Sequence, residues 1–268
     1  MQGFLKGGVL KYQAALDAIQ RLGDLSLNCK ILANMGEAYR KSGQFEDAII
    51  HLEDSLEISK AIRDRDQEGK TLCLLGISWA DSVFSNRIDE GSEVVEAKNK
   101  RMNTYEKAAS FITLSKEIFN SLGDKFLLGW AFEMESRISL MKDDWNGAIQ
   151  SCKLARKLKY DSPYIHMNLA YCYSMLKDER LSKVQQEIAR KKLTEAESND
   201  YDIACLESIR HNYNEAFKLL TNSLKIGFGR RASILRDPLL KGLCMNPFYL
   251  NKINEMDNLS DYHMKHFM

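Results

Sequence analysis

Internal repetition constrains this 268-residue chain more than any other sequence feature, because a fixed period implies that successive segments fold into similar units. Residues 45–64 return without a gap as residues 105–124, and a shift of 40 positions places residues 3–24 on residues 43–64. Small and apolar residues coincide in these copies: Ala48, Leu52, Ser55 and Ile58 correspond to Ala108, Ile112, Ser115 and Ile118. Further copies begin near Asp144 and Asn212.

A second type of segment precedes these copies, at residues 32–39, 72–79, 168–173 and 202–206. In each of them a small residue follows an apolar one, and in three of them an aromatic residue comes three positions later. This spacing puts the small and the large side chain on one face of a helix, so that a neighbouring helix can cross closely at the small residue. The sequence therefore predicts pairs of helices.

An all-α fold follows from this pattern and from the scarcity of residues that break helices, with only 3 prolines and 15 glycines. The predicted elements are one unpaired helix over residues 4–22 and five helix pairs. The predicted pairs cover residues 27–41 with 45–62, 67–85 with 93–122, 126–141 with 145–159, 163–176 with 179–194, and 197–210 with 213–226.

These segments resemble the tetratricopeptide repeat family, and the 40-residue spacing resembles its longer variant. The resemblance covers residues 3–228 and implies a right-handed α-α superhelical solenoid of stacked antiparallel helix pairs. The chain departs from the family pattern at Ser136 and Ser139, which replace the small residue and the aromatic residue, and at Ser182, which replaces an alanine.

The predicted domain organisation is a solenoid over residues 1–228, followed by a capping segment and tail over residues 229–268. Residues 81–104 form an insertion of about 20 residues in the second pair, either a binding element or a lengthened helix pair. In the C-terminal segment Pro238 and Pro247 suit the first turn of a helix, with Asp237 and Asn246 as its caps. Such a segment would cover the open apolar end of the last pair.

Several classes of function are disfavoured by composition and by missing motifs. A formal net charge of +1 supplies no long-range attraction toward nucleic acid or an anionic membrane. No segment approaches the about 20 apolar residues that span a bilayer. The sequence offers no phosphate-binding loop, no catalytic pair, no metal site and no cofactor motif, and its six scattered cysteines suit small buried residues in a cytoplasmic protein. We therefore expect a cytoplasmic protein that is not an enzyme.

Binding is the better expectation, because the first helices of stacked pairs line a concave surface suited to a peptide or a partner helix. Residues on the face opposite the packed small residue are the candidates for this surface. They are Lys30, Asn34, Glu37 and Lys41, then Lys70 and Leu74, then Arg137, and finally Asn168 and Tyr171. The resemblance implies that the Asn34 and Asn168 amides grip a ligand main chain. Alternatively, they are exposed residues or polar groups between helices.

The leading hypothesis is thus a scaffold for protein–protein interaction in signalling or assembly, with a protein or peptide ligand. A second hypothesis is a self-associating unit, with a homodimer formed through the N-terminal helix, where Gly7, Gly8 and Tyr12 would leave an apolar face open. A third is the regulatory sensor domain of a larger signalling protein.

Overall fold

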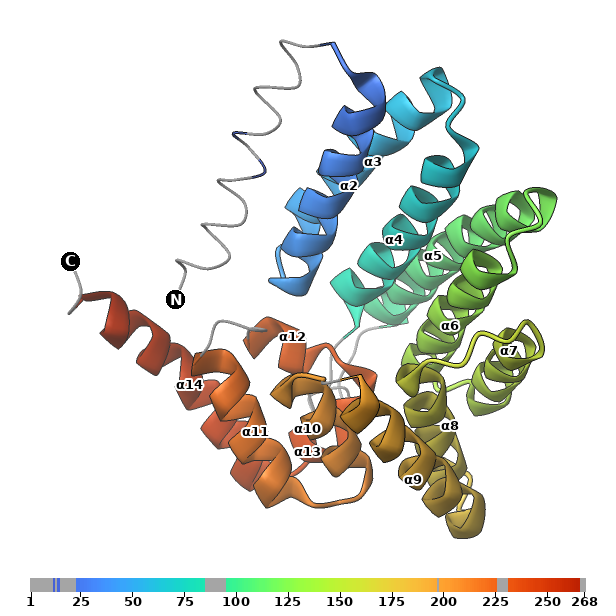
Figure 1. The fold of residues 1–268 in the computed structure, drawn as a ribbon. Coiled ribbons are helices and arrows are strands. Elements are labelled where there is room, and N and C mark those ends of the chain that lie inside the picture. Colours follow the sequence, from blue (N-terminus) through green and yellow to red (C-terminus); the bar gives the residue numbers. More distant parts are fainter. Residues whose placement is uncertain are drawn as a thin grey trace. The chain divides into compact units, whose positions relative to one another are not determined.

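The computed structural model describes residues 12, 14, 23–84, 95–196, 198–225 and 231–265 (Figure 1). Within these ranges the regular elements are thirteen α-helices and one short 3-10 helix, η2, with no strand among them. The prediction of an all-α fold is therefore confirmed. No helix in the described ranges combines the length and the apolar character that crossing a bilayer requires.

The helices divide between two compact units. Among the described residues, the α2–α7 unit runs to Asp161, and the α8–α14 unit begins at Ser162. The first unit contains α2 (Leu25–Lys41), α3 (Phe45–Ala61), α4 (Arg65–Val83), α5 (Val95–Ser121), α6 (Lys125–Met141) and α7 (Trp145–Lys157). The second contains α8 (Pro163–Met175), α9 (Glu179–Glu195), α10 (Asp200–Ile209), α11 (Tyr213–Lys225), α12 (Arg231–Leu235), η2 (Pro238–Leu240), α13 (Lys241–Cys244) and α14 (Pro247–Lys265).

Consecutive helices pack as pairs, α2 with α3, α4 with α5, α6 with α7, α8 with α9, and α10 with α11. The ends of these helices lie within three residues of the predicted ones. The largest difference is at α10, which was expected from residue 197 and begins at Asp200. Asn199 explains this start, because its side-chain oxygen accepts hydrogen bonds from the backbone N–H groups of Tyr201 and Asp202 at 2.9 and 3.1 Å.

Aspartates fix the start of five described helices. Each carboxylate accepts a hydrogen bond from the backbone N–H three residues later, at 2.8–3.0 Å. The residue before each aspartate has a positive φ, which reverses the chain between a helix and the next one. Glycine occupies this position at Gly23 and Gly123, whereas Arg63 adopts φ 58° at the equivalent place. The capping aspartates are Asp24, Asp64, Asp124, Asp144 and Asp178.

Glycines in the first helices permit the close crossing that the sequence pattern predicted. A Cβ atom on Gly36 would lie 2.5 Å from Leu52 Cγ, and one on Gly76 would lie 2.8 Å from the backbone oxygen of Ala108. Real Cβ atoms essentially never come that close to another heavy atom. The prediction of a small residue at each helix crossing is thus confirmed for these two pairs.

In each of these two pairs, a serine of the second helix forms a hydrogen bond with the backbone of the first helix. The Ser55 hydroxyl donates to the backbone oxygen of Cys29 at 2.7 Å, and the Ser115 hydroxyl donates to that of Gly69 at 2.8 Å. Cys29 and Gly69 are themselves 40 positions apart, so the hydrogen bond repeats with the sequence. Ser182, which departs from the repeat pattern, donates to the Ala170 backbone oxygen at 2.9 Å. Its hydroxyl is therefore satisfied although it is buried.

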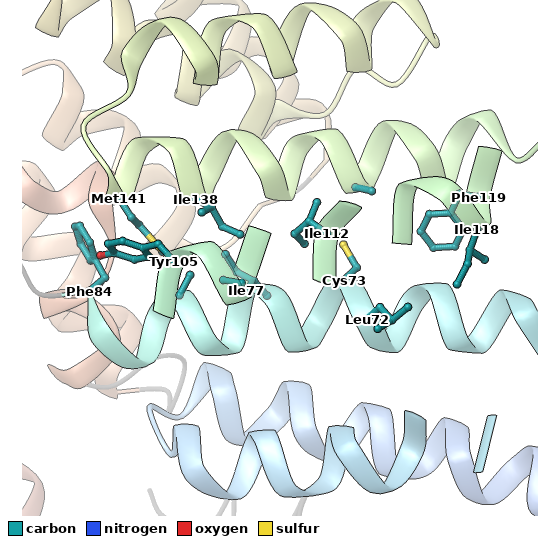
Figure 2. Packing of buried hydrophobic residues seen from close by; sticks show 13 residues of the cluster. Leu72, Cys73, Ile77, Phe84, Tyr105, Ile112, Ile118, Phe119, Ile138 and Met141 are labelled. Atoms are coloured by element: carbon teal, nitrogen blue, oxygen red, sulfur yellow. The ribbon is translucent and has the colours of Figure 1, made fainter. Parts of the chain in front are cut away.

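A buried apolar cluster of the α2–α7 unit lies among α4, α5 and α6 (Figure 2). Apolar side chains of these three helices, among them Ile77, Ile112 and Ile138, interdigitate there and remove their surface from water. The cluster joins the second pair to the third, since α6 belongs to the third. Burial in this unit thus runs from pair to pair rather than staying within one pair.

The two ends of the predicted solenoid were expected to hold an unpaired helix and a cap. Tyr12 is helical and packs against the cluster of Ile31, Leu32 and Met35 on α2. Of the predicted helix 4–22, all residues other than 12 and 14 lie outside the described residues. At the other end, Asp237 and Asn246 cap η2 and α14 as predicted, accepting from Leu239 N at 3.0 Å and Phe248 N at 3.1 Å. The elements η2 and α13 pack against α10.

Candidate functional site

The first helices of the three pairs in the α2–α7 unit lie next to each other: α2 contacts α4, and α4 contacts α6. Seven of the nine predicted binding residues lie on these three helices. We call the surface formed by these residues and their neighbours the α2–α4–α6 face. It comprises Lys30, Asn34, Glu37, Arg40 and Lys41 of α2, Lys70, Leu74 and Asp81 of α4, and Met134 and Arg137 of α6.

The predicted residues of this face differ in exposure. Lys30, Asn34 and Lys41 are exposed. Glu37 and Arg137 are half-buried, as are Lys70 and Leu74. Lys70 makes an ion pair with Asp66 one turn earlier on α4, at 2.5 Å. The exposed groups of this row therefore lie on α2.

Arg40 organises the charges at the C-terminal end of α2. Its guanidinium grips the Glu37 carboxylate with two hydrogen bonds, Nε to Oε2 at 2.7 Å and Nη2 to Oε1 at 2.9 Å. Its third nitrogen, Nη1, donates a hydrogen bond to Asp81 Oδ2 on α4 at 2.5 Å. Bidentate pairing of this kind fixes a guanidinium in both position and orientation.

Asp81 joins all three first helices through its carboxylate. One oxygen accepts from Arg40 of α2, and the other accepts from Arg137 Nη2 of α6 at 3.4 Å. The Asp81 side chain is only 4% exposed, so water can do little to stabilise its charge. The two guanidinium groups supply that stabilisation instead. Asp81 thus links the first helices of three pairs, and a positively charged arginine lies on each side of its carboxylate.

The electrostatics of this network favour its ionised form. Burial, the largest single influence, acts to raise the pKa of Glu37, but the charges and hydrogen bonds of Arg40 and Lys41 together hold the pKa below the usual value. Burial acts to lower the pKa of Arg40, but the Glu37 and Asp81 carboxylates raise it further. Arg40 is therefore a permanent cation, and Glu37 stays charged at neutral pH.

Sequence reasoning missed Arg40 and Asp81 as members of this site. Asp81 occupies the repeat position of Lys41, 40 residues later, so the repeat alone suggested no role for it. One signal was available. A carboxylate in the last turn of a helix opposes the helix dipole, and α4 has no basic residue in its last turn to offset it. Such a residue needs a cation from another element, which Arg40 and Arg137 provide.

Asn168 and Tyr171 require a correction to the predicted row. Both belong to α8 in the other unit, and they are buried, 4% and 6% exposed. Their burial follows from the neighbours of α8, which packs against α9, α10 and η2. The α8 helix is enclosed over residues 165–172, so neither side chain stands on an exposed row beside solvent. The predicted row is thus corrected in its exposure alone: Asn34 is exposed, whereas Asn168 is buried.

Reactive groups elsewhere in the described residues are held in protective surroundings. All six cysteines are free and buried, as the sequence predicted. Burial raises the pKa of the Cys152 thiol to about 12, and it raises that of Cys73 as well. No group of three or more His, Cys, Asp or Glu side chains within the described ranges could hold a metal ion.

Comparison of the sequence with protein-family models gives no match, and comparison with curated proteins gives none.

Proposed function

We propose that this chain is a scaffold for protein–protein interaction, built from helix pairs of the tetratricopeptide type, whose α2–α4–α6 face binds a peptide or helical segment of a partner. The observation that carries the proposal is the placement of Lys30, Asn34 and Lys41 as exposed groups on one face of α2. That helix lies beside α4, which supplies Lys70 and Leu74, and α4 lies beside α6. Side-by-side first helices offer a continuous surface several helices wide.

The contacts that recur between the two helices of a pair support the tetratricopeptide type of packing. The crossing at Gly36 and Gly76 and the hydrogen bond from Ser55 and Ser115 recur at the same places in two pairs. Repetition of both sequence and contact is the basis on which helix pairs stack into a solenoid. We extend this proposal to the whole chain, including the two pairs α8–α9 and α10–α11.

A binding role fits the chemistry of the face better than a catalytic one. The acidic groups at its centre, Glu37 and Asp81, accept hydrogen bonds from arginine side chains. A general acid or base needs a pKa near neutrality, whereas the arginine contact moves that of Glu37 away from it. These carboxylates therefore act as structural partners of the arginines, and Glu37 also pairs with Lys41 at 3.4 Å. We expect Lys30, Asn34 and Lys41, which are exposed, to contact a ligand.

Photo-cross-linking in cells that express the protein natively tests this proposal. A photoreactive amino acid replaces Asn34 on the α2–α4–α6 face, and in a matched variant it replaces Asp54, an exposed residue of α3. We expect a discrete cross-linked product from position 34 and none from position 54. Identical products from both positions, or none from either, would contradict a binding role for this face.

A further inference from the structure

Charge is distributed unequally between the two helices of the first pair. The first helix, α2, contains three basic residues, Lys30, Arg40 and Lys41, and one acidic residue, Glu37. The second helix, α3, contains five acidic residues and one basic residue, Lys60. The acidic residues of α3 are all exposed: Glu46, Asp47, Glu53, Asp54 and Glu57. The pair is thus positive on α2 and negative on α3, although the whole chain carries a net charge of only +1.

Ion pairing on the α2–α4–α6 face reinforces this difference. Arg40 and Arg137 form ion pairs with the carboxylates of Glu37 and Asp81, and Lys41 Nζ also lies 3.4 Å from Glu37 Oε1. The two arginines and the two carboxylates sum to zero charge. Lys70 and Asp66 also pair with one another. Lys30 and Lys41 add two positive charges, and both side chains are exposed. The face therefore presents a net positive charge to whatever approaches it.

Apolar contact is available between these charges. Leu74 of α4 and Met134 of α6 are half-buried, and each packs against a buried cluster of the unit. They occupy the repeat positions of Asn34, so they lie in the same row as the exposed amide. A ligand that crosses the face from α2 to α6 passes a lysine-rich edge first and an apolar strip next.

We propose that the partner segment recognised by the α2–α4–α6 face is acidic, with apolar side chains that contact Leu74 and Met134. This inference rests on the proposed function of the same face. Opposite charge attracts such a segment to α2, while the five carboxylates of α3 repel it from the other side of the pair. Adjacent helices lie about 8–10 Å apart, so a segment of about 15 residues in helical form spans the three first helices.

A displayed library of random peptides, each about 15 residues long, tests this inference on the complete chain. Peptides are selected against the unmodified protein at low salt, and the net charge of the enriched sequences is measured. Enriched peptides are then bound to two variants. Lys30→Gln with Lys41→Gln removes two charges from the face, and Lys60→Gln with Lys153→Gln removes two exposed charges from α3 and α7.

We expect an enriched pool with a net negative charge and binding that weakens as salt rises. We expect about fivefold to tenfold weaker binding to the Lys30 and Lys41 variant, with unchanged binding to the Lys60 and Lys153 variant. All four side chains are exposed, and replacing Lys41 also removes its ion pair with Glu37 at 3.4 Å. Circular dichroism spectra of both variants that match the unmodified protein verify the fold.

Other outcomes separate the inference from the proposal on which it rests. A neutral or basic enriched pool that loses binding when Leu74 is replaced by Asp would overturn acidic recognition and retain a binding face. Acidic recognition would also be overturned if acidic peptides bound both lysine variants equally well, because other residues would then attract the peptides. A library that yields no enriched sequence would overturn both. A salt-sensitive homodimer that is lost in the Lys30 and Lys41 variant would identify a second copy as the occupant and refute a separate partner.

Discussion

Arg40 of α2 donates a hydrogen bond of 2.5 Å to Asp81 of α4, and these two residues belong to successive helix pairs. Apolar contacts between pairs, such as those among α4, α5 and α6, are non-directional. A charge-assisted hydrogen bond is directional instead. The two side chains here are only 16% and 4% exposed, so each charge needs the other for stabilisation. This contact therefore sets how α2 and α4 meet at their C-terminal ends.

Replacement of Asp81 by Ala tests the energetic weight of this contact. It leaves Arg40 and Arg137 close together without the carboxylate between them. We expect a loss of about 2–3 kcal/mol in the free energy of unfolding, because removing one member of a largely buried ion pair leaves the opposite charges uncompensated. Urea unfolding measures the loss. Asp66→Ala is the control, since it removes the half-exposed partner of Lys70 on the same helix and should cost less than about 1 kcal/mol. Equal losses would contradict a special role for Asp81.

The lowered pKa of Glu37 makes a prediction about acid stability. A group with a lower pKa in the folded state binds protons more readily when unfolded, so its contribution is complete above the unfolded pKa. That contribution starts to fall as pH drops through the ordinary value of 4.5 and disappears below the folded pKa. Glu37→Gln should therefore reduce the dependence of unfolding free energy on pH below 4.5.

Urea unfolding at a series of pH values from neutral to acidic measures this change. The control is Glu53→Gln, which alters an exposed carboxylate of α3. It should leave the acid slope of the unmodified protein nearly unchanged. The attribution to Arg40 fails if the Glu37 variant and the Glu53 variant follow the same curve.

Gly76→Ala tests the close crossing of α4 and α5. In an unobstructed helix this substitution stabilises by about 1 kcal/mol, because alanine is the better helix former. Here the added Cβ would lie 2.8 Å from the Ala108 backbone oxygen and from Ile112 Cδ1, and backbone cannot rotate away. We expect destabilisation by about 2 kcal/mol instead, measured by thermal or urea unfolding. A stabilised variant would show that the two helices separate at no cost.

Ser115→Ala tests the hydrogen bond that recurs between the helices of a pair. Loss of the bond to the Gly69 backbone oxygen should lower the free energy of unfolding by about 1 kcal/mol. Ser110→Ala is the control on the same helix, since Ser110 is exposed and donates only to the Lys107 backbone oxygen within α5. It should change stability by less than about 0.5 kcal/mol. Similar effects from both would mean that the bond between helices contributes nothing beyond helix propensity.

Local sequence signals predicted helices and their ends well. The spacing of Gly36 and Tyr39, or of Gly76 and Trp79, predicted which side of a first helix packs closely. The aspartates that begin α2 and α4 act within three residues, so their effect can be read along the chain. Such signals involve residues that are only a few positions apart, so a short sequence pattern is enough to predict them.

The candidate site was only partly predictable. Helical geometry placed Lys30, Asn34 and Lys41 on one face, and these residues are exposed. The same geometry placed Asn168 and Tyr171 on an equivalent row, yet both are buried. A helical period indicates which residues share a face but not which elements cover that face. For α8 the covering elements include α10 and η2, which lie far along the chain.

The sequence by itself determined the helix pairs, their caps and the small residues at their crossings, because all of these arise from contacts at fixed short spacings. Only the tertiary structure decided that Arg40, Asp81 and Arg137 meet. These residues are 41 and 56 positions apart, and their contact exists because α4 lies between α2 and α6. Charge pairing acts through space, so no period along the chain encodes it. The repeat even assigns Asp81 the place of a lysine.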